Sequence, residues 1–177
     1  IGVETFYNLS INKSNGSEVI LSNEVTLEAN NSSLNFSGTN GYITLNGNDF
    51  TINHWSDGKI TGYDENEFFI VDQTSFIKYI GITNGEKLNI PMGLGTGSTK
   101  YARADITLTN AGDGTFDANL CGQIQLDGGI CTGTAATTKA VSYTWNFIST
   151  SNNAVVALYW DTSCLLYTSD AADDSLR

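Results

Sequence analysis

Residues 5–52 read TFYNLSINKSNGSEVILSNEVTLEANNSSLNFSGTNGYITLNGNDFTI. Short segments with an apolar residue at every second position alternate here with clusters of Asn, Gly and Ser. This alternation is typical of half-buried β-strands, and Asn and Gly tolerate the positive φ of tight turns. The predicted strands are Phe6–Ile11, Val19–Leu21, Val25–Leu27, Leu34–Phe36, Tyr42–Leu45 and Phe50–Ile52.

A unit this short cannot bury its apolar row alone, so successive units must stack on one another. The repeat therefore predicts the coils of a β-solenoid (β-helix), which we expect over residues 1–76. The last part of this region, residues 54–76, is expected to form either the final coil or a cap. A cap is physically favoured because the open edge of a solenoid invites aggregation.

Residues 77–163 lack the short repeat and contain longer alternating segments separated by turns. Several such segments without a helical pattern between them predict a β-sandwich. The predicted fold class is therefore all-β, with a short β-solenoid followed by a β-sandwich module. The strands expected in the module are Lys87–Ile90, Ala104–Thr109, Gly114–Ala118, Ala140–Ile148 and Ala154–Trp160.

The aromatic residues of the last two strands fall on alternating positions and so share a face. We expect them in the sandwich core, where burial of each large side chain stabilises by about 1.5–3 kcal/mol. An exposed platform for stacking on sugar rings is the alternative. The residues concerned are Tyr143, Trp145 and Phe147 on one strand and Val156, Leu158 and Trp160 on the next.

The whole chain of 177 residues carries a formal net charge of −11, with only eight Lys and Arg. Nucleic acid and anionic membrane surfaces require clustered basic residues, so we do not expect either as a partner. No apolar run approaches the roughly 18 residues that a membrane-spanning helix needs. We therefore expect no membrane insertion.

Residues 164–174 read CLLYTSDAADD and resemble the in-frame translation of a transposase-type sequencing adapter. We therefore expect that residues 164–177 are a non-biological tail, of the kind that metagenomic sequence assembly leaves, and that they are no part of the fold. A genuine acidic C-terminal segment is the alternative. We also expect Ile1 to be a cut within a longer chain.

Without that tail the chain has two cysteines, Cys121 and Cys131, which lie ten positions apart. A disulfide across such a loop stabilises by about 2–3 kcal/mol in the chain-entropy model and is typical of extracellular proteins. The alternative is two unpaired small apolar side chains. Zinc binding is not expected, because the chain has a single histidine, His54, and zinc takes four ligands.

Four stretches of residues 77–163 form a recognisable series: Ile90–Gly93, Tyr101–Ala104, Val141–Phe147 and Ala157–Asp161. Together they resemble a β-sandwich module of large secreted surface proteins of Bacteroidetes-type bacteria, which are commonly exported by type IX secretion. Thr5–Asn12 is similar to the coils that precede such modules, and Ala102-Arg103 departs from the Ser-Pro usual in the family.

The resemblance implies an extracellular, cell-surface location and an adhesin-like or structural role within a long polypeptide. Its implied partners are the rest of that polypeptide and surface glycans or proteins. It implies no catalytic residue and no cofactor. The leading hypothesis is therefore a non-enzymatic structural or adhesive segment.

The sequence leaves two further functions open. A carbohydrate-binding module would use exposed aromatic residues, and Trp55 and Tyr63 in predicted turns are the candidates for a glycan contact. A β-solenoid polysaccharide hydrolase or lyase would need clustered carboxylates on one solenoid face. The acidic residues considered for it are Asp57, Asp64, Glu65 and Glu67.

Calcium is the one metal for which the sequence offers candidates, because it takes oxygen ligands in flexible loops. One candidate group is the acidic turn with Asp64, Glu65 and Glu67, and solvated turn residues are the favoured interpretation there. The second group lacks the spacing of an EF-hand, and glycine-assisted turns with acidic surface charge are the favoured interpretation there. Its members are Asp113, Asp117 and Asp127.

Overall fold

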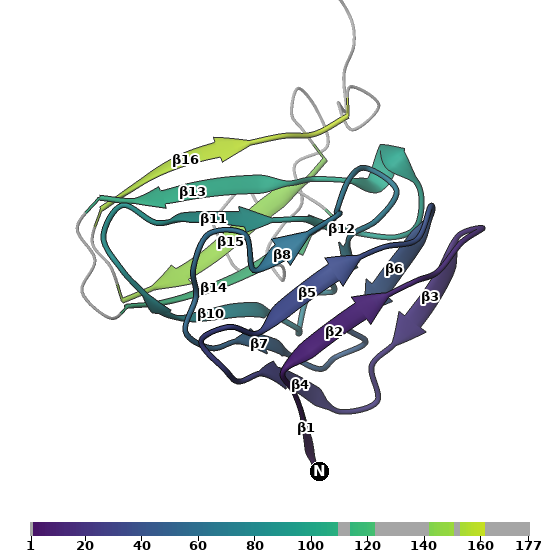
Figure 1. Ribbon diagram of the computed structural model, residues 1–177. Coiled ribbons are helices and arrows are strands. Elements are labelled where there is room, and N and C mark those ends of the chain that lie inside the picture. The colour runs from purple at the N-terminus through teal and green to yellow at the C-terminus, as the bar shows by residue number, and fades with distance from the viewer. Residues whose placement is uncertain (1, 110–113, 123–141, 151–152, 162–177) are drawn as a thin grey trace, which may run out of the picture.

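The computed structural model describes residues 2–109, 114–122, 142–150 and 153–161. These residues form strands and one short 3₁₀ turn, η1 (Ser98–Lys100). The first twelve strands make four successive coils of three strands each, so the β-solenoid prediction is confirmed (Figure 1). The described part of the chain contains no helix with the length and apolarity of a membrane span.

The first strands of the four coils pair in parallel and make one wall of the solenoid. The register of this wall stacks apolar residues above one another, because Val25 pairs with Phe50 and Phe50 pairs with Ile77. All three are buried, so each coil extends the core of the one before. The strands of this wall are β1 (Val3–Phe6), β4 (Glu24–Leu27), β7 (Phe50–Ile52) and β10 (Ile77–Ile82).

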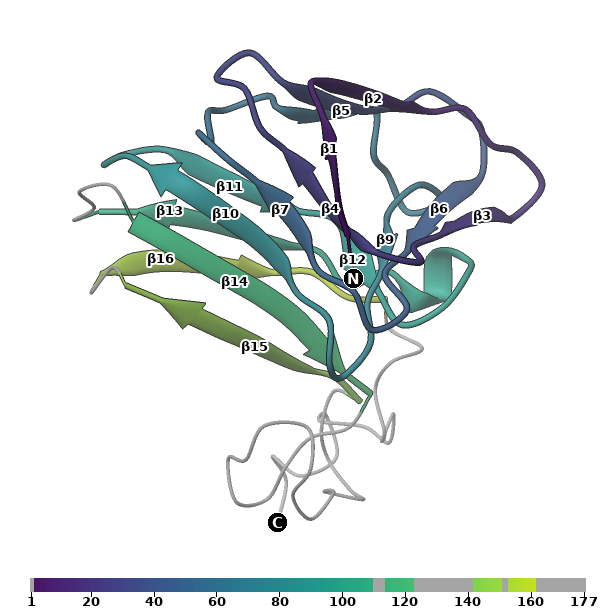
Figure 2. The same cartoon turned by 90° about the horizontal axis from the view of Figure 1, so that it is seen from below.

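The other two walls are also parallel sheets, and together the three walls enclose the core (Figure 2). In the third wall one column of inward residues runs through all four coils from Val19 to Met92. The second wall comprises β2 (Asn8–Ile11), β5 (Ser33–Phe36) and β8 (Ile60–Thr61). The third comprises β3 (Ser17–Ile20), β6 (Gly41–Thr44), β9 (Phe69–Ile70) and β12 (Met92–Gly93).

The turns follow the expected chemistry. Asn15 and Asn46 adopt positive φ values of 58° and 52°, and each is followed by a glycine that also has positive φ. Residues 54–76, expected as a final coil or a cap, instead contribute β8 and β9 to the third coil. A fourth coil follows, so this region lies inside the solenoid.

The fourth coil changes the architecture. β10 pairs with β7 in parallel on one side and with β14 (Gly114–Cys121) antiparallel on the other. β15 (Thr144–Ser149) then continues the same sheet. β11 (Lys87–Ile90) leaves the second wall and pairs antiparallel with β13 (Ala104–Leu108), which pairs with β16 (Ala154–Leu158). Figure 2 shows these two antiparallel parts as neighbouring layers.

The separate β-sandwich expected over residues 77–163 is not confirmed. β10 and β12 belong to the solenoid sheets, and a single buried cluster runs from Ile11 to Tyr143. Trp145 and Phe147 pack against this cluster, as expected for core residues. The expectation was wrong for Val156 and Trp160, which are 44% and 42% exposed. Val156 lies in β16, the edge strand of its sheet, and Trp160 follows the end of that strand.

Candidate functional site

The structure buries Trp55, the first candidate for a glycan contact. Its side chain is 3% exposed, and its ring meets that of Tyr79 edge-on at 4.8 Å between centroids. The chain turns at the end of β7, and this turn directs the indole into the core cluster. The expectation that Trp55 is exposed is therefore wrong, and a sugar ring cannot stack on it.

Tyr63, the second candidate, follows β8 in the third coil and is half-buried. The guanidinium of Arg103 lies over its ring, 5.5 Å from the centroid. The same guanidinium lies 5.2 Å from the ring centroid of Tyr159, which follows β16. Two tyrosines from distant parts of the chain therefore contact one arginine, and a glycan contact at Tyr63 stays a prediction.

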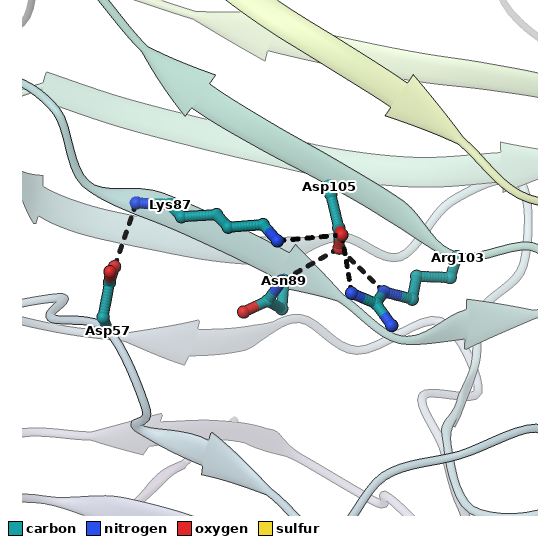
Figure 3. A network of polar contacts seen from close by, with 5 residues as sticks. All are labelled: Asp57, Lys87, Asn89, Arg103 and Asp105. Carbon is teal, nitrogen blue, oxygen red and sulfur yellow. Dashed lines mark hydrogen bonds and ion pairs between the residues drawn. The ribbon is translucent and has the colours of Figure 1, made fainter.

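Asp105 in β13 fixes this arginine through a pair of hydrogen bonds. Nε of Arg103 donates to Oδ1 of Asp105 at 2.7 Å, and Nη2 donates to Oδ2 at 2.6 Å. Nδ2 of Asn89 donates to Oδ1 at 2.9 Å, and Nζ of Lys87 lies 3.2 Å from Oδ2. Figure 3 shows Lys87 and Arg103 reaching the carboxylate from two sides.

We call Tyr63, Lys87, Asn89, Arg103, Asp105 and Tyr159 the Arg103 cluster. Its two strands meet because Asn89 pairs directly with Asp105 across β11 and β13. Lys87 and Asn89 stand two positions apart, as do Arg103 and Asp105, so each pair lies on one face of the sheet. The cluster covers Asp105, which is only 5% exposed.

Burial would raise the pKa of Asp105, but the hydrogen bonds from Arg103, Asn89 and Lys87 outweigh it and hold the pKa below its usual value. In turn, the hydrogen bond to Asp105 raises the pKa of Arg103. Burial raises the pKa of Tyr63. The ion pair of Arg103 with Asp105 is therefore charged at neutral pH, whereas Tyr63 is neutral.

We expect Asp105→Asn to lower the free energy of unfolding by about 1–3 kcal/mol at pH 7, the usual cost of losing hydrogen bonds to a charged group. Because the pKa of Asp105 is lower in the folded state, its contribution is complete above the unfolded pKa of about 3.9 and is lost as the pH falls through the folded value. Urea unfolding of both proteins between pH 7 and pH 2.5 measures this difference.

Glu65→Gln is the matched control, because Glu65 is an exposed carboxylate in a turn. It should change stability by less than about 0.5 kcal/mol at every pH. If the stability difference between Asp105→Asn and the parent stays the same down to the lowest pH, the ionised carboxylate does not contribute to the free energy of unfolding.

The acidic turn predicted around residue 65 places Asp64 and Glu67 side by side, with backbone hydrogen bonds in both directions. Glu67 is 6% exposed, and burial together with the charge of Asp64 raises its pKa. Among the described residues there is no group of three or more His, Cys, Asp or Glu that could hold a metal ion. The structure therefore gives the calcium hypothesis for this turn no support.

The second calcium candidate falls largely outside the described residues, which include neither Asp113 nor Asp127. Asp117 is described and pairs with Lys78 across β10 and β14. Burial raises the pKa of Asp117, and the charge of Lys78 opposes that rise. Its observed surroundings are those of a sheet residue beside a lysine.

Cys121 ends β14, is completely buried and is disulfide-bonded. Cys131 lies outside the described residues, so its pairing with Cys121 stays a prediction.

Comparison with protein-family models, with curated proteins and with solved structures finds no match to this chain.

Proposed function

We propose that this chain is a non-catalytic structural or adhesive segment of a large secreted or cell-surface protein. One observation carries the proposal: the strands of the first coil are unpaired on their outer side. In the described part of the chain, all three parallel walls therefore end in an open strand edge at the same end of the solenoid. β1, β2 and β3 are each the outermost strand of their sheet. An outermost strand presents unpaired N–H and C=O groups that can template a further strand.

Apolar side chains accompany this open end. Val3, Tyr7 and Ile20 are 54%, 68% and 61% exposed. In a solenoid each coil contacts only its neighbours, so an end with exposed apolar residues is completed by a coil of the same kind. The partner that fits this end best is therefore further β-solenoid chain of the same polypeptide.

The disulfide at Cys121 supports an extracellular location, because disulfides persist in oxidising compartments and are rare in the cytosol. Export by type IX secretion rests on the sequence resemblance described above. The excess of acidic residues also fits a β-rich surface protein, since mutual repulsion limits aggregation.

The proposal is tested by adding one coil to the open end. A copy of residues 24–48 placed directly before Val3 gives the spacing that separates the paired residues Val25 and Phe50. We expect this protein to melt about 3 °C or more above the parent, because the added coil covers exposed apolar surface. Thermal melts and binding of the dye ANS measure the effect, and ANS fluorescence should fall.

The control carries the same copy with Leu27→Asp, Leu34→Asp and Ile43→Asp in the copy alone. These three side chains are buried in the parent, so the altered copy cannot stack and the melting temperature should stay at the parent value. The proposal fails if the protein with the unaltered copy shows no rise in melting temperature and the amide hydrogens of the copy exchange at the rate of an unfolded peptide.

The carbohydrate-binding alternative has one observation in its favour, the Arg103 cluster with its partly exposed Tyr159. The hydrolase or lyase alternative has no observation of this kind. Asp57 accepts a hydrogen bond from the backbone N of Lys87, whereas Asp64 accepts one from the backbone N of Asn66 within its own turn.

A further inference from the structure

We propose that the Arg103 cluster is a binding surface for a neutral sugar ring, with the partly exposed ring of Tyr159 as the stacking platform. This inference goes beyond the structural role proposed above and does not depend on it. It rests on three features of the cluster: an exposed aromatic ring, a rigid support beneath that ring, and hydrogen-bond donors beside it.

The exposed ring is that of Tyr159, which is 48% exposed. The guanidinium of Arg103 contacts this ring and that of Tyr63. A tyrosine ring is apolar on its faces and polar at its hydroxyl, so it suits the C–H groups and hydroxyls of a pyranose. A ring held in place loses little conformational entropy when a ligand binds.

The support beneath the ring is unusually well fixed. The backbone N of Tyr159 donates to the backbone O of Arg103 at 2.9 Å. The side chain of Arg103 is in turn held by both oxygens of Asp105, which is 5% exposed. Sites on strands with locked side chains are more precise than sites on loops, and this platform is anchored to β13.

The donors of the cluster belong to Arg103, whose guanidinium lies over the ring of Tyr159, and to Lys87, which contacts the same carboxylate of Asp105. An ammonium group has three N–H donors and a guanidinium has five. Lys87 is 47% exposed, so its donors reach the surface as well as the carboxylate of Asp105. A few polar groups placed next to an apolar surface are what fix the orientation of a small ligand.

The charge balance of the cluster favours a neutral ligand. The two positive charges of Lys87 and Arg103 are matched by Asp105 and by Asp57, which accepts a hydrogen bond from the backbone N of Lys87 at 2.9 Å (Figure 3). No net positive charge is left to select an anion, and the chain as a whole is strongly acidic. A uronate or sulfated sugar is therefore not the expected ligand.

The test is calorimetric titration of the intact protein with four hexasaccharide probes. Three probes are neutral, the oligomers of xylose, of β-1,4-linked glucose and of mannose, and the fourth is the charged oligogalacturonate. We expect at least one neutral probe to bind, and Tyr159→Ala to weaken that binding about tenfold or more, which corresponds to about 1.4 kcal/mol. Tyr159→Phe keeps the ring and should bind nearly as well as the parent.

Tyr7→Ala is the matched control, because Tyr7 is a more exposed tyrosine, at 68%, in the first coil. It should bind within about twofold of the parent, a difference of about 0.4 kcal/mol. The proposal is overturned if no neutral probe binds, if Tyr159→Ala binds as tightly as Tyr7→Ala, or if oligogalacturonate alone binds. Circular dichroism melts of each variant confirm that it is folded. Because coil addition is scored by stability and this test by binding, either proposal can fail while the other stands.

Discussion

Replacing Phe69 by Ala is expected to lower the free energy of unfolding by about 3–5 kcal/mol, the range found for large-to-small changes at buried aromatic residues. Phe69 in β9 is completely buried. Its ring lies 5.8 Å from that of Phe36 in β5 and 4.9 Å from that of Phe50 in β7. These three rings come from the three different walls, so the substitution leaves a cavity where all the walls meet.

Chemical denaturation with a fluorescence or circular dichroism signal measures this effect. Ile20→Ala is the control, because Ile20 lies in the same wall but is 61% exposed, and it should cost less than about 0.5 kcal/mol. A loss for Phe69→Ala no larger than the loss for Ile20→Ala would mean that the three walls do not share a packed core.

The second large effect is expected for Gly62→Ala, at about 2–4 kcal/mol from backbone strain and overpacking combined. Gly62 has a φ of 72°, which side chains rarely adopt. A Cβ at this position would lie 1.8 Å from the backbone O of Phe36 in the coil beneath. Neither backbone can move without disturbing the parallel pairing of β5 with β8.

Gly58→Ala separates the two causes. Gly58 has a φ of 83°, but a Cβ there would meet nothing within 4 Å. It should therefore cost only the strain of the positive φ, about 1 kcal/mol. Urea unfolding of both variants gives the comparison. Equal losses at the two positions would argue that the stacked coils are not in close contact at Gly62.

The coil strands could be predicted because side-chain alternation is a local property. The corners between walls could not. Residues 6–11 were expected as one strand, but the structure has β1 and β2 with Tyr7 between them. The alternation of apolar and polar residues continues through this corner, so the sequence pattern alone does not reveal where the chain changes wall.

The sandwich expectation shows a different limit. The segments Lys87–Ile90 and Ala104–Leu108 are strands, as expected. Strands pair through the backbone N–H and C=O groups along their edges. The pattern of side chains carries little information about which two edges will meet. Nothing in the sequence of β10 distinguishes the side that pairs with β7 from the side that pairs with β14.

The same limit applies to the candidate site. Tyr63 could be proposed from the sequence because it is an aromatic residue in a turn, whereas the buried Trp55 met the same criterion. The other five cluster residues, Tyr159 among them, were missed as site candidates, although the i, i+2 spacing of four of them was visible in the sequence. Only the register that sets Asn89 against Asp105 brings them together. These four are Lys87, Asn89, Arg103 and Asp105.

β10 pairs in parallel with β7 and antiparallel with β14, so the two ends of the solenoid differ in how they can be extended. Beyond β14 the wall is antiparallel, so coils cannot be appended at that end without breaking the existing sheet. Whole coils can nevertheless be inserted or deleted before β7, because each coil has parallel strand edges on both sides. The third coil, which carries Tyr63, is kept in every such change. Every such step changes the height of the solenoid by about 4.8 Å and leaves the Arg103 cluster intact, so coil number is a natural length adjustment for this architecture.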